Sequence, residues 1–402
     1  MWVLVLAVAL SVSTAFIDGS DVDRHANMST CDLIMDFGYT CETFKTTTED
    51  GYVLEADRVG KKKGLLGRSL LTPKHSPIIL VPGILSESGT WFVNFPSQSP
   101  GYILADHGFD VWAMNTREIA ARSRNIHHIR ADDDRYWQWS FNEIGRYDLA
   151  ATVDLVLNTT GASKVTLLAF SQGFTSSLVL LSTRPEYNRK VSLLMGYGPV
   201  ANLSGVQFPF PQIIAVSDPI FLLLDPIGDS GYFYLPEAPR EMMQAICDNY
   251  KEQVCSTSLI VTMISSPQQV NSTRMPVILA HYPIGTSYKN LRHFVQIYRT
   301  GRFAMYDYGF LKNIEKYGKA VPPNYPVERI EVPVALFSSV GDTVADSDDV
   351  SDLAQALYGT LFFHNVVPPT NFRHLDFVLG HQATDFLHEN MLAAIDKKVP
   401  RT

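Results

Sequence analysis

The sequence predicts an α/β fold in which helices cover both faces of a mostly parallel sheet. Short apolar runs typical of buried strands alternate with segments of helical periodicity between residues 76 and 200. The strand pattern returns at residues 332–337. The chain has 402 residues, 46% of them hydrophobic and 18% charged, so it can bury a large core. We therefore expect one large α/β core that is interrupted by an insertion.

Each element of this pattern has its own signal. Glu49-Asp50-Gly51 is a turn signal that predicts an early hairpin. Ser140 and Glu143 have the spacing of a capping box and predict a helix that runs to Gly161. The other elements are strands at residues 76–81, 109–113, 164–170, 191–195, 332–337 and 362–367, and a helix at 101–107.

The alternation stops near residue 201. Residues 208–239 are aromatic, proline-rich and apolar without a clean period, which predicts an inserted cap rather than another unit of the sheet. More than half of its large apolar side chains should form the core of the cap. The predicted domains are a core of residues 16–200 and 328–402 and a cap of residues 201–327.

The N-terminus indicates a secreted protein. Residues 1–15 form an apolar run that ends in Ser13-Thr14-Ala15, a small-x-small cleavage site, and we interpret them as a signal peptide although no basic residue precedes the run. No other stretch reaches a spanning length without charge or proline, so we expect no transmembrane anchor. Four sequons agree with secretion and are candidate glycosylation sites: Asn27, Asn158, Asn202 and Asn271.

The cysteines fall into two close pairs, which in a secreted protein suggests the disulfides Cys31–Cys41 and Cys247–Cys255. This is one of three connectivities that four cysteines allow. A zinc site fits the spacing less well, and no histidine cluster accompanies the cysteines.

The net charge of −8 argues against a nucleic-acid partner. The basic run between Lys61 and Lys74 is typical of a solvated loop, with a contact to anionic lipid as the alternative.

Residues 164–173 contain the candidate nucleophile. An apolar run ends at Ser171, Gly173 follows two residues later, and a helical segment begins at once. This is the layout of a nucleophile elbow, in which a strained turn between a strand and a helix holds a serine out of the sheet. In this sequence, Ala169 stands in place of the first glycine of the usual G-x-S-x-G pattern. A catalytic serine also needs a histidine and an acid.

Asp342 and His374 are the best candidates for that acid and that base. Asp342 follows the strand at 332–337, at the carboxyl edge where sites of such folds gather. Asp346 is its rival. The rivals of His374 are His364, expected within a strand, and His381, expected in the last helix. Ser347, Asp348 and Asp349 resemble the cap and first turn of a helix.

The order Ser171, Asp342, His374 is that of the α/β-hydrolases. Over nearly its whole mature length, the chain also resembles the acid lipase family of gastric and lysosomal acid lipases. The motifs that carry the resemblance are residues 47–54 (TTEDGYVL), 103–106 (ILAD), 109–112 (FDVW), 139–143 (WSFNE), 147–150 (YDLA), 283–287 (PIGTS), 306–309 (YDYG) and 374–377 (HLDF).

The resemblance implies a catalytic triad of Ser171, Asp342 and His374. It also implies a cap at residues 201–327 that contains a Cys247–Cys255 disulfide. Three departures from the family pattern stand near the site: Ala169-Phe170 replace Gly-His, Pro82 replaces the histidine before Gly83, and Glu118 replaces the glycine after Asn115-Thr116-Arg117. They bear on substrate preference and leave every triad member in place.

The sequence therefore predicts a secreted or lysosomal glycoprotein that hydrolyses carboxylic esters of neutral lipids, triacylglycerol or sterol ester, through an acyl-enzyme. The backbone N–H groups of Gln172 and Ile84 would hold the oxyanion. We expect a monomer that acts at a lipid–water interface without metal or organic cofactor, and Leu222 and Leu223 of the cap as candidates for facing lipid. The alternatives are a lipid carrier with an inactive site and, on the same fold, a peptidase or short-ester esterase.

Overall fold

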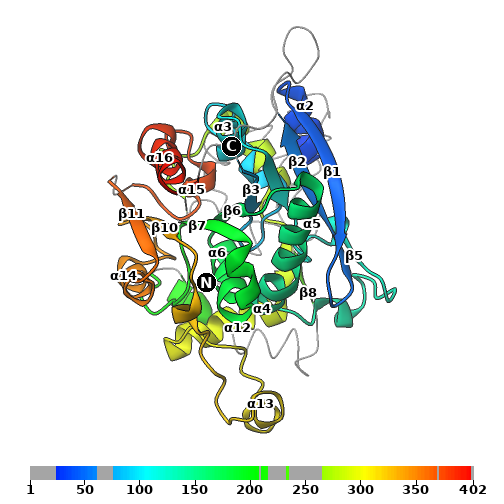
Figure 1. Ribbon diagram of the computed structural model, residues 1–402, viewed down its shortest axis with the longest axis vertical. Helices are drawn as coiled ribbons and strands as arrows, with labels where there is room; N and C mark the ends of the chain where they lie inside the picture. The colour runs from blue at the N-terminus through cyan, green and yellow to red at the C-terminus, as the bar shows by residue number, and fades with distance from the viewer. Residues whose placement is uncertain are drawn as a thin grey trace, which may run out of the picture.

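The computed structural model describes residues 24–60, 76–207, 210–215, 232–234, 265–368 and 371–399. Its centre is a nine-stranded sheet in the order β1-β2-β4-β3-β6-β7-β10-β11, with β5 paired to β2 (Figure 1). The strands are β1 (Thr40–Thr47), β2 (Tyr52–Gly60), β3 (Ile78–Val81), β4 (Val111–Met114), β5 (Ser123–Asn125), β6 (Val165–Phe170), β7 (Val191–Tyr197), β10 (Val334–Ser339) and β11 (Leu361–Val367).

The sheet is mixed, and its larger part is parallel. β2 runs antiparallel to β1, β4 and β5, whereas every neighbouring pair from β4 to β11 is parallel. The predicted mostly parallel sheet is confirmed. Since the carboxyl ends of parallel strands meet at one edge, β6 and β10 bring their following loops close together.

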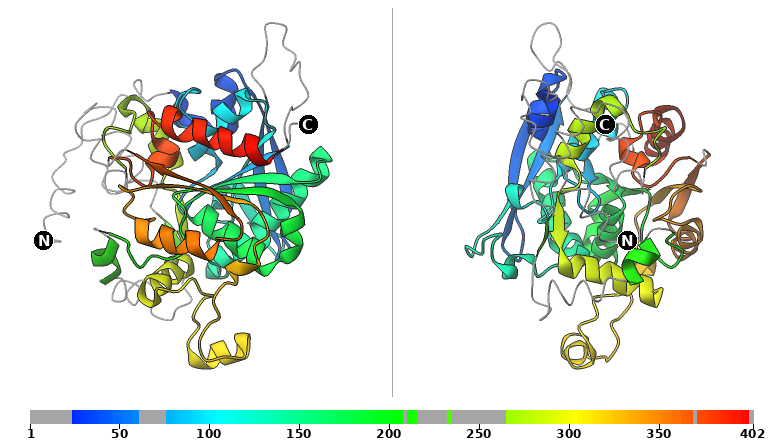
Figure 2. Two further views of the ribbon diagram at one scale, coloured as in Figure 1. Left: turned by 60° about the vertical axis from the view of Figure 1, so that its left-hand side comes forward. Right: turned by 180° about the vertical axis from the view of Figure 1, so that it is seen from behind.

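Helices cover both faces, as Figure 2 shows for α16 and α14 on opposite sides of the sheet. β6 is buried from both sides: Leu168 and Phe170 join one apolar cluster, and Leu167 and Ala169 join the other. The helices around the sheet are α2 (Thr30–Asp36), α3 (Pro100–Asp106), α4 (Phe141–Glu143), α5 (Ala150–Thr160), α6 (Gln172–Thr183), α14 (Ser347–Ala356), α15 (Asp376–Leu379) and α16 (Glu389–Lys398).

Most predicted elements form where their signals lie. The hairpin is β1–β2, and Ser140 and Glu143 make both hydrogen bonds of the capping box. Between Ile144 and Leu149 the helix is π-wound before it continues as α5, which ends at Gly161 with φ +70°.

Two local predictions are wrong. The N-cap of α14 is Asp346, not Ser347, because the Asp346 carboxylate accepts the N–H of Asp348 (2.9 Å). His381 lies before the last helix, where its backbone N–H and Nδ1 both bond to the carbonyl of Gln269.

The described part of the chain between β7 and β10 adds no strand to the main sheet. It contains α7 (Phe210–Ala215), β8 (Tyr232–Tyr234), α11 (Met275–His281), β9 (Gly285–Ser287), α12 (Tyr288–Thr300) and α13 (Phe310–Tyr317). β8 and β9 form a separate antiparallel pair. None of the described helices is long and apolar enough to cross a membrane.

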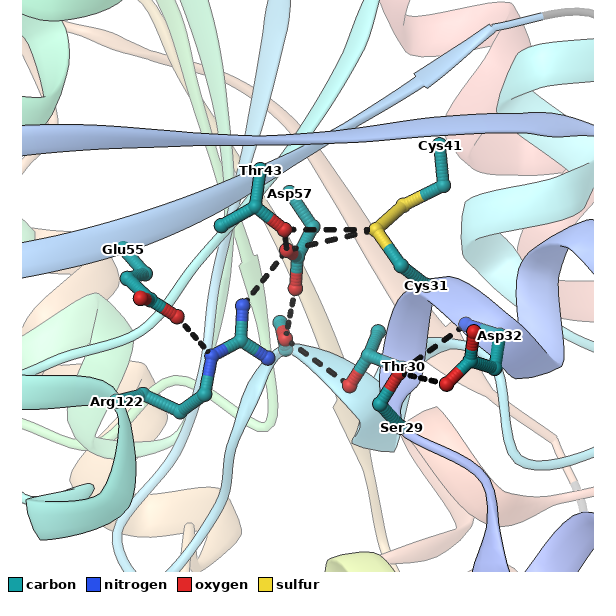
Figure 3. The surroundings of a disulfide bond; sticks show 10 residues. Ser29, Thr30, Cys31, Asp32, Cys41, Thr43, Glu55, Asp57 and Arg122 are labelled. Carbon is teal, nitrogen blue, oxygen red and sulfur yellow. Dashed lines mark hydrogen bonds and ion pairs between the residues drawn. A yellow bond between two sulfur atoms is a disulfide. The ribbon is translucent and has the colours of Figure 1, made fainter.

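Several predictions fall on residues outside the described ranges. They are the signal peptide at 1–15, the basic run from Lys61 to Lys74, the lipid-facing Leu222 and Leu223, and the Cys247–Cys255 disulfide. The other disulfide, Cys31–Cys41, is present and ties α2 to β1 (Figure 3).

The disulfide lies beside a buried carboxylate. Asp57 accepts hydrogen bonds from Thr43, Ser88 and Arg122 at 2.7–2.8 Å. In the described part of the chain, Cys31, Cys41 and Asp57 are the one group of three metal-ligand side chains that lie close together. Because both sulfurs are bonded to each other, neither offers a thiolate to a metal ion.

Candidate active site

Ser171 stands on a strained turn between β6 and α6. Its φ is +52°, and only two other non-glycine residues of the described chain, Leu85 and His128, have positive φ. Such a conformation costs about 1–3 kcal/mol and is found at functional sites. The turn is held by the hydrogen bond from the Ser171 N–H to the Tyr197 carbonyl of β7 (3.0 Å).

Gly173 allows this turn to form. A Cβ at position 173 would lie 2.4 Å from the carbonyl oxygen of Val81 and 2.7 Å from that of Pro82. Both are backbone atoms at the end of β3, which cannot move as a side-chain tip can. The glycine therefore lets the first turn of α6 pack directly against β3. Ala169, in contrast, lies within β6 and buries its methyl in the apolar cluster below α6.

The structure brings Ser171, His374 and Asp342 together. The Ser171 hydroxyl lies 2.8 Å from His374 Nε2, and His374 Nδ1 lies 2.8 Å from Asp342 Oδ2. Since a carboxylate only accepts hydrogen bonds, Nδ1 carries the proton and Nε2 accepts from the serine. All three side chains are buried.

Asp342 has further acceptor bonds that fix its carboxylate. Its Oδ1 accepts the backbone N–H groups of Val344 (2.8 Å) and Ala345 (2.9 Å). The aspartate is thus the acceptor at the centre of a tight turn after β10, and its other oxygen faces the histidine. Gly198 stands close by, where a Cβ would come within 3.0 Å of His374 Nδ1.

The rival residues lie elsewhere. Asp346 caps α14 and accepts a hydrogen bond from Gln207 (2.7 Å), and Asp349 accepts the N–H groups of Ser204 and Gly205. His364 lies within β11 and bonds to Ser338 (2.8 Å). Together with the position of His381 described above, this leaves His374 as the histidine of the rival set that contacts Ser171.

The loop after β3 passes directly beside the serine. A Cβ on Gly83 would lie 3.3 Å from Ser171 Cβ and 2.8 Å from the ring of Phe170. Ile84 follows in this loop. Gln172 is the first residue of α6, so its N–H has no partner within its own helix. The two predicted oxyanion donors therefore belong to segments that flank Ser171.

A buried polar network behind the elbow could not be read from the sequence. Gln172 donates from Nε2 to Glu118 Oε2 (2.7 Å) and accepts at Oε1 from Asn290 of α12 (2.6 Å). Thr116 also donates to Glu118 (3.2 Å). Burial raises the pKa of Glu118 to about 8, although hydrogen bonds oppose the shift. The one sequence signal was a glutamate where the resembled family has glycine.

Asp376 fixes the turn that carries His374. Its carboxylate accepts the N–H of Arg373 (2.7 Å) and of Ser266 (3.1 Å) and the hydroxyl of Ser265. Burial raises the pKa of Asp376 to about 7. The aspartate of the HLDF motif thus ties the histidine loop to the segment before α11.

The candidate glycosylation sites differ in exposure. Asn27 and Asn158 are exposed, whereas Asn202 and Asn271 are half-buried. The Asn271 side-chain oxygen caps a short helical turn by accepting from Thr273.

Comparisons with known proteins give the family and the fold of the chain. Residues 30–95 match the family described as the partial alpha/beta-hydrolase lipase region. The chain is 32% identical to Lipase 1 of Drosophila melanogaster over 94% of its own length and 82% of the relative's. It is 30% identical to gastric triacylglycerol lipase of Mus musculus over 91% of each chain.

The chain belongs to the acid lipase family. The fold agrees: an alpha/beta hydrolase fold protein from Nakamurella multipartita superposes with a TM-score of 0.50 at 13% identity, covering 88% of this chain and 98% of that one. The predicted family and α/β-hydrolase fold are confirmed, and membership of the family makes the protein a hydrolase of the lipase and esterase class.

Proposed function

We propose that this acid lipase family member hydrolyses carboxylic esters of neutral lipids through a Ser171-His374-Asp342 triad. The observation that carries the proposal is the continuous hydrogen-bond chain from the Ser171 hydroxyl through both ring nitrogens of His374 to Asp342, each step 2.8 Å. Triacylglycerol and sterol ester are the proposed substrates. The gastric triacylglycerol lipases among the relatives support the first of these.

The geometry suits acyl transfer. Ser171 Oγ would attack the ester carbonyl carbon while its proton passes to His374 Nε2. The N–H groups of Gln172 and Ile84 would donate to the oxyanion, each worth about 3 kcal/mol. The C–O bond then breaks, and the leaving alcohol takes the proton from His374. Water repeats the cycle on the acyl-enzyme, and Asp342 stabilises the imidazolium each time it forms.

We also propose a cellular compartment and an oligomeric state. The Cys31–Cys41 disulfide and the exposed sequons Asn27 and Asn158 support passage through an oxidising, glycosylating compartment. We propose a monomer that is secreted or lysosomal.

Labelling with a fluorophosphonate tests the nucleophile. The wild type should be labelled on Ser171, and Ser171→Ala should fold normally, resist the label and lose ester hydrolysis. A folded wild type that resists the label would favour the lipid carrier. Full activity in Ser171→Ala would refute the triad.

A substrate panel tests the substrate class. Triacylglycerol, cholesteryl ester, a short soluble ester and a peptide would be compared across pH. Preference for the short ester or the peptide would contradict the lipase assignment while leaving the triad intact.

A further inference from the structure

The segment that carries α13 stands out from the body of the molecule, as Figures 1 and 2 show. Its two legs are joined at the base: Met305 N–H donates to the Pro323 carbonyl and Tyr325 N–H to the Phe303 carbonyl, both at 2.9 Å. Ala304 and Asn324 form a bridge between them. The projection is therefore a closed, internally bonded unit. We call residues 306–322 the α13 tip.

The α13 tip is amphipathic, with a polar inner contact and an apolar outer side. The inward position is Asn313, which is 1% exposed and bonds to the Tyr308 N–H, the Asp307 carboxylate and the Ala320 carbonyl at 2.7–2.9 Å. A surface helix normally turns its apolar stripe toward the core and its polar residues outward. Here a polar side chain makes the inner contacts.

The outward side is apolar. Phe310 is 65% exposed, Leu311 77%, Ile314 45% and Val321 56%. No other described stretch of equal length holds more than two exposed large apolar side chains. Phe310, Leu311 and Ile314 share one face of the helix because Ile314 lies four residues after Phe310 and three after Leu311. Contiguous exposed apolar surface of this kind marks a site of interaction.

The charged residues of the tip indicate which kind of partner the apolar face binds. Three exposed lysines belong to the tip: Lys312, Lys316 and Lys319. Lys312 and Lys316 lie four residues apart on the side of α13 away from Phe310 and Ile314, and Lys319 follows the helix. The acids of the tip are Glu315 and Asp307, and the Asp307 carboxylate accepts from Gly309 and Asn313. The lysines of the tip thus outnumber its acids, although the whole chain has a net charge of −8. Helices with a basic polar face and Phe or Leu on the other side lie in the interface of anionic lipid surfaces.

The tip is linked to the active site through α12. Asn290, near the start of this 13-residue helix, holds the side chain of Gln172, and the chain leaves the far end of α12 toward the tip. At 1.5 Å per residue, α12 is about 20 Å long.

We propose that the α13 tip is a second lipid-binding element, which inserts Phe310, Leu311 and Ile314 into an anionic lipid surface while its lysines contact the headgroups. The choice of lipid as occupant rests on the proposed lipase function, but binding does not require catalysis.

Vesicle flotation tests this proposal with the full chain. The wild type should bind vesicles of phosphatidylcholine with roughly 30% phosphatidylserine better than phosphatidylcholine alone, and salt should weaken the difference. The double substitution Phe310→Asp, Leu311→Asp should weaken binding by about tenfold or more, because burial of either side chain shifts an equilibrium by about that factor. Lys312→Gln with Lys319→Gln should remove the preference for the anionic vesicles.

Controls separate this result from misfolding and from catalysis. Tyr358→Ser, at a site 87% exposed outside the tip, should bind as the wild type does, and all variants should keep the wild-type thermal unfolding. Ser171→Ala should also bind fully, so a failure of the proposed chemistry would leave the binding result readable.

Two results would overturn the proposal. One is wild-type binding by the Phe310→Asp, Leu311→Asp variant. The other is absence of wild-type binding to both kinds of vesicle. If the wild type then forms a dimer that Leu311→Asp abolishes, the apolar face pairs with a second copy of the chain instead of lipid.

Discussion

Glu118 should make the stability of the protein depend on pH in a way that one substitution removes. Its carboxyl is buried, and burial raises its pKa from an ordinary value of 4.5 to about 8. The native state therefore keeps a proton that the unfolded chain releases. The stabilising contribution is complete below pH 4.5 and is lost as the pH rises through about 8. At about 1.4 kcal/mol per pKa unit, the loss is at most roughly 5 kcal/mol.

Glu118→Gln tests this directly. The glutamine amide has nearly the same shape, carries no titrating proton, and its oxygen can still accept from Gln172 Nε2 and Thr116. The free energy of unfolding would be measured in urea at pH 5, 6, 7 and 8 for both proteins. The wild type should lose stability relative to Glu118→Gln by up to about 1.4 kcal/mol per pH unit. Glu328→Gln, at an exposed glutamate, is the matched control.

Activity supplies a second readout. Ionised Glu118 would place a negative charge behind Gln172, whose N–H is one of the two proposed oxyanion donors. Turnover of a soluble ester should fall above about pH 8 in the wild type and less in Glu118→Gln. A stability difference between the two proteins that stays constant from pH 5 to 8 would refute the reasoning, because Glu118 would then titrate like a solvated carboxyl.

Three further tests by substitution address other parts of the site and fold. Asp342→Asn should lower kcat for ester hydrolysis by about 10³–10⁴-fold, because His374 would adopt the wrong tautomer. Asp346→Asn should leave kcat unchanged and lower stability by about 1 kcal/mol or less, since it weakens a helix cap. If Asp346→Asn were instead the variant that lost activity, the assignment of the triad acid would be wrong. Gly173→Ala should lower the free energy of unfolding by about 1–3 kcal/mol, because the added Cβ meets backbone oxygens. Gly359→Ala, whose Cβ meets nothing within 4 Å, should be neutral in the same urea titration. Equal stabilities of the two variants would contradict the packing argument. Replacing Cys31 and Cys41 by serine should lower the free energy of unfolding by about 3 kcal/mol for a loop of this length. If the serine variant were as stable as the oxidised wild type, the disulfide would contribute nothing to stability.

Local signals in the sequence determined much of the fold. The capping box at Ser140, the glycine at 161 and the apolar runs of the strands act over a few residues, so their effects can be read without the rest of the chain. The same holds for Ser171 and Gly173, because the strain of the elbow and the close approach of β3 are demands on neighbouring positions.

Tertiary structure alone decided which distant groups meet. Asp342 and His374 reach each other because β10 and β11 are adjacent parallel strands whose following loops share one edge of the sheet. The pairing of Glu118 with Gln172 and Asn290 joins three segments that no local rule connects, and the raised pKa of Glu118 follows from that burial. The outward apolar face of α13 is also a tertiary fact. The helical period of residues 310–317 fixes which side chains share a face, but only the packing of Asn313 against Asp307, Tyr308 and Ala320 turns that face to the solvent.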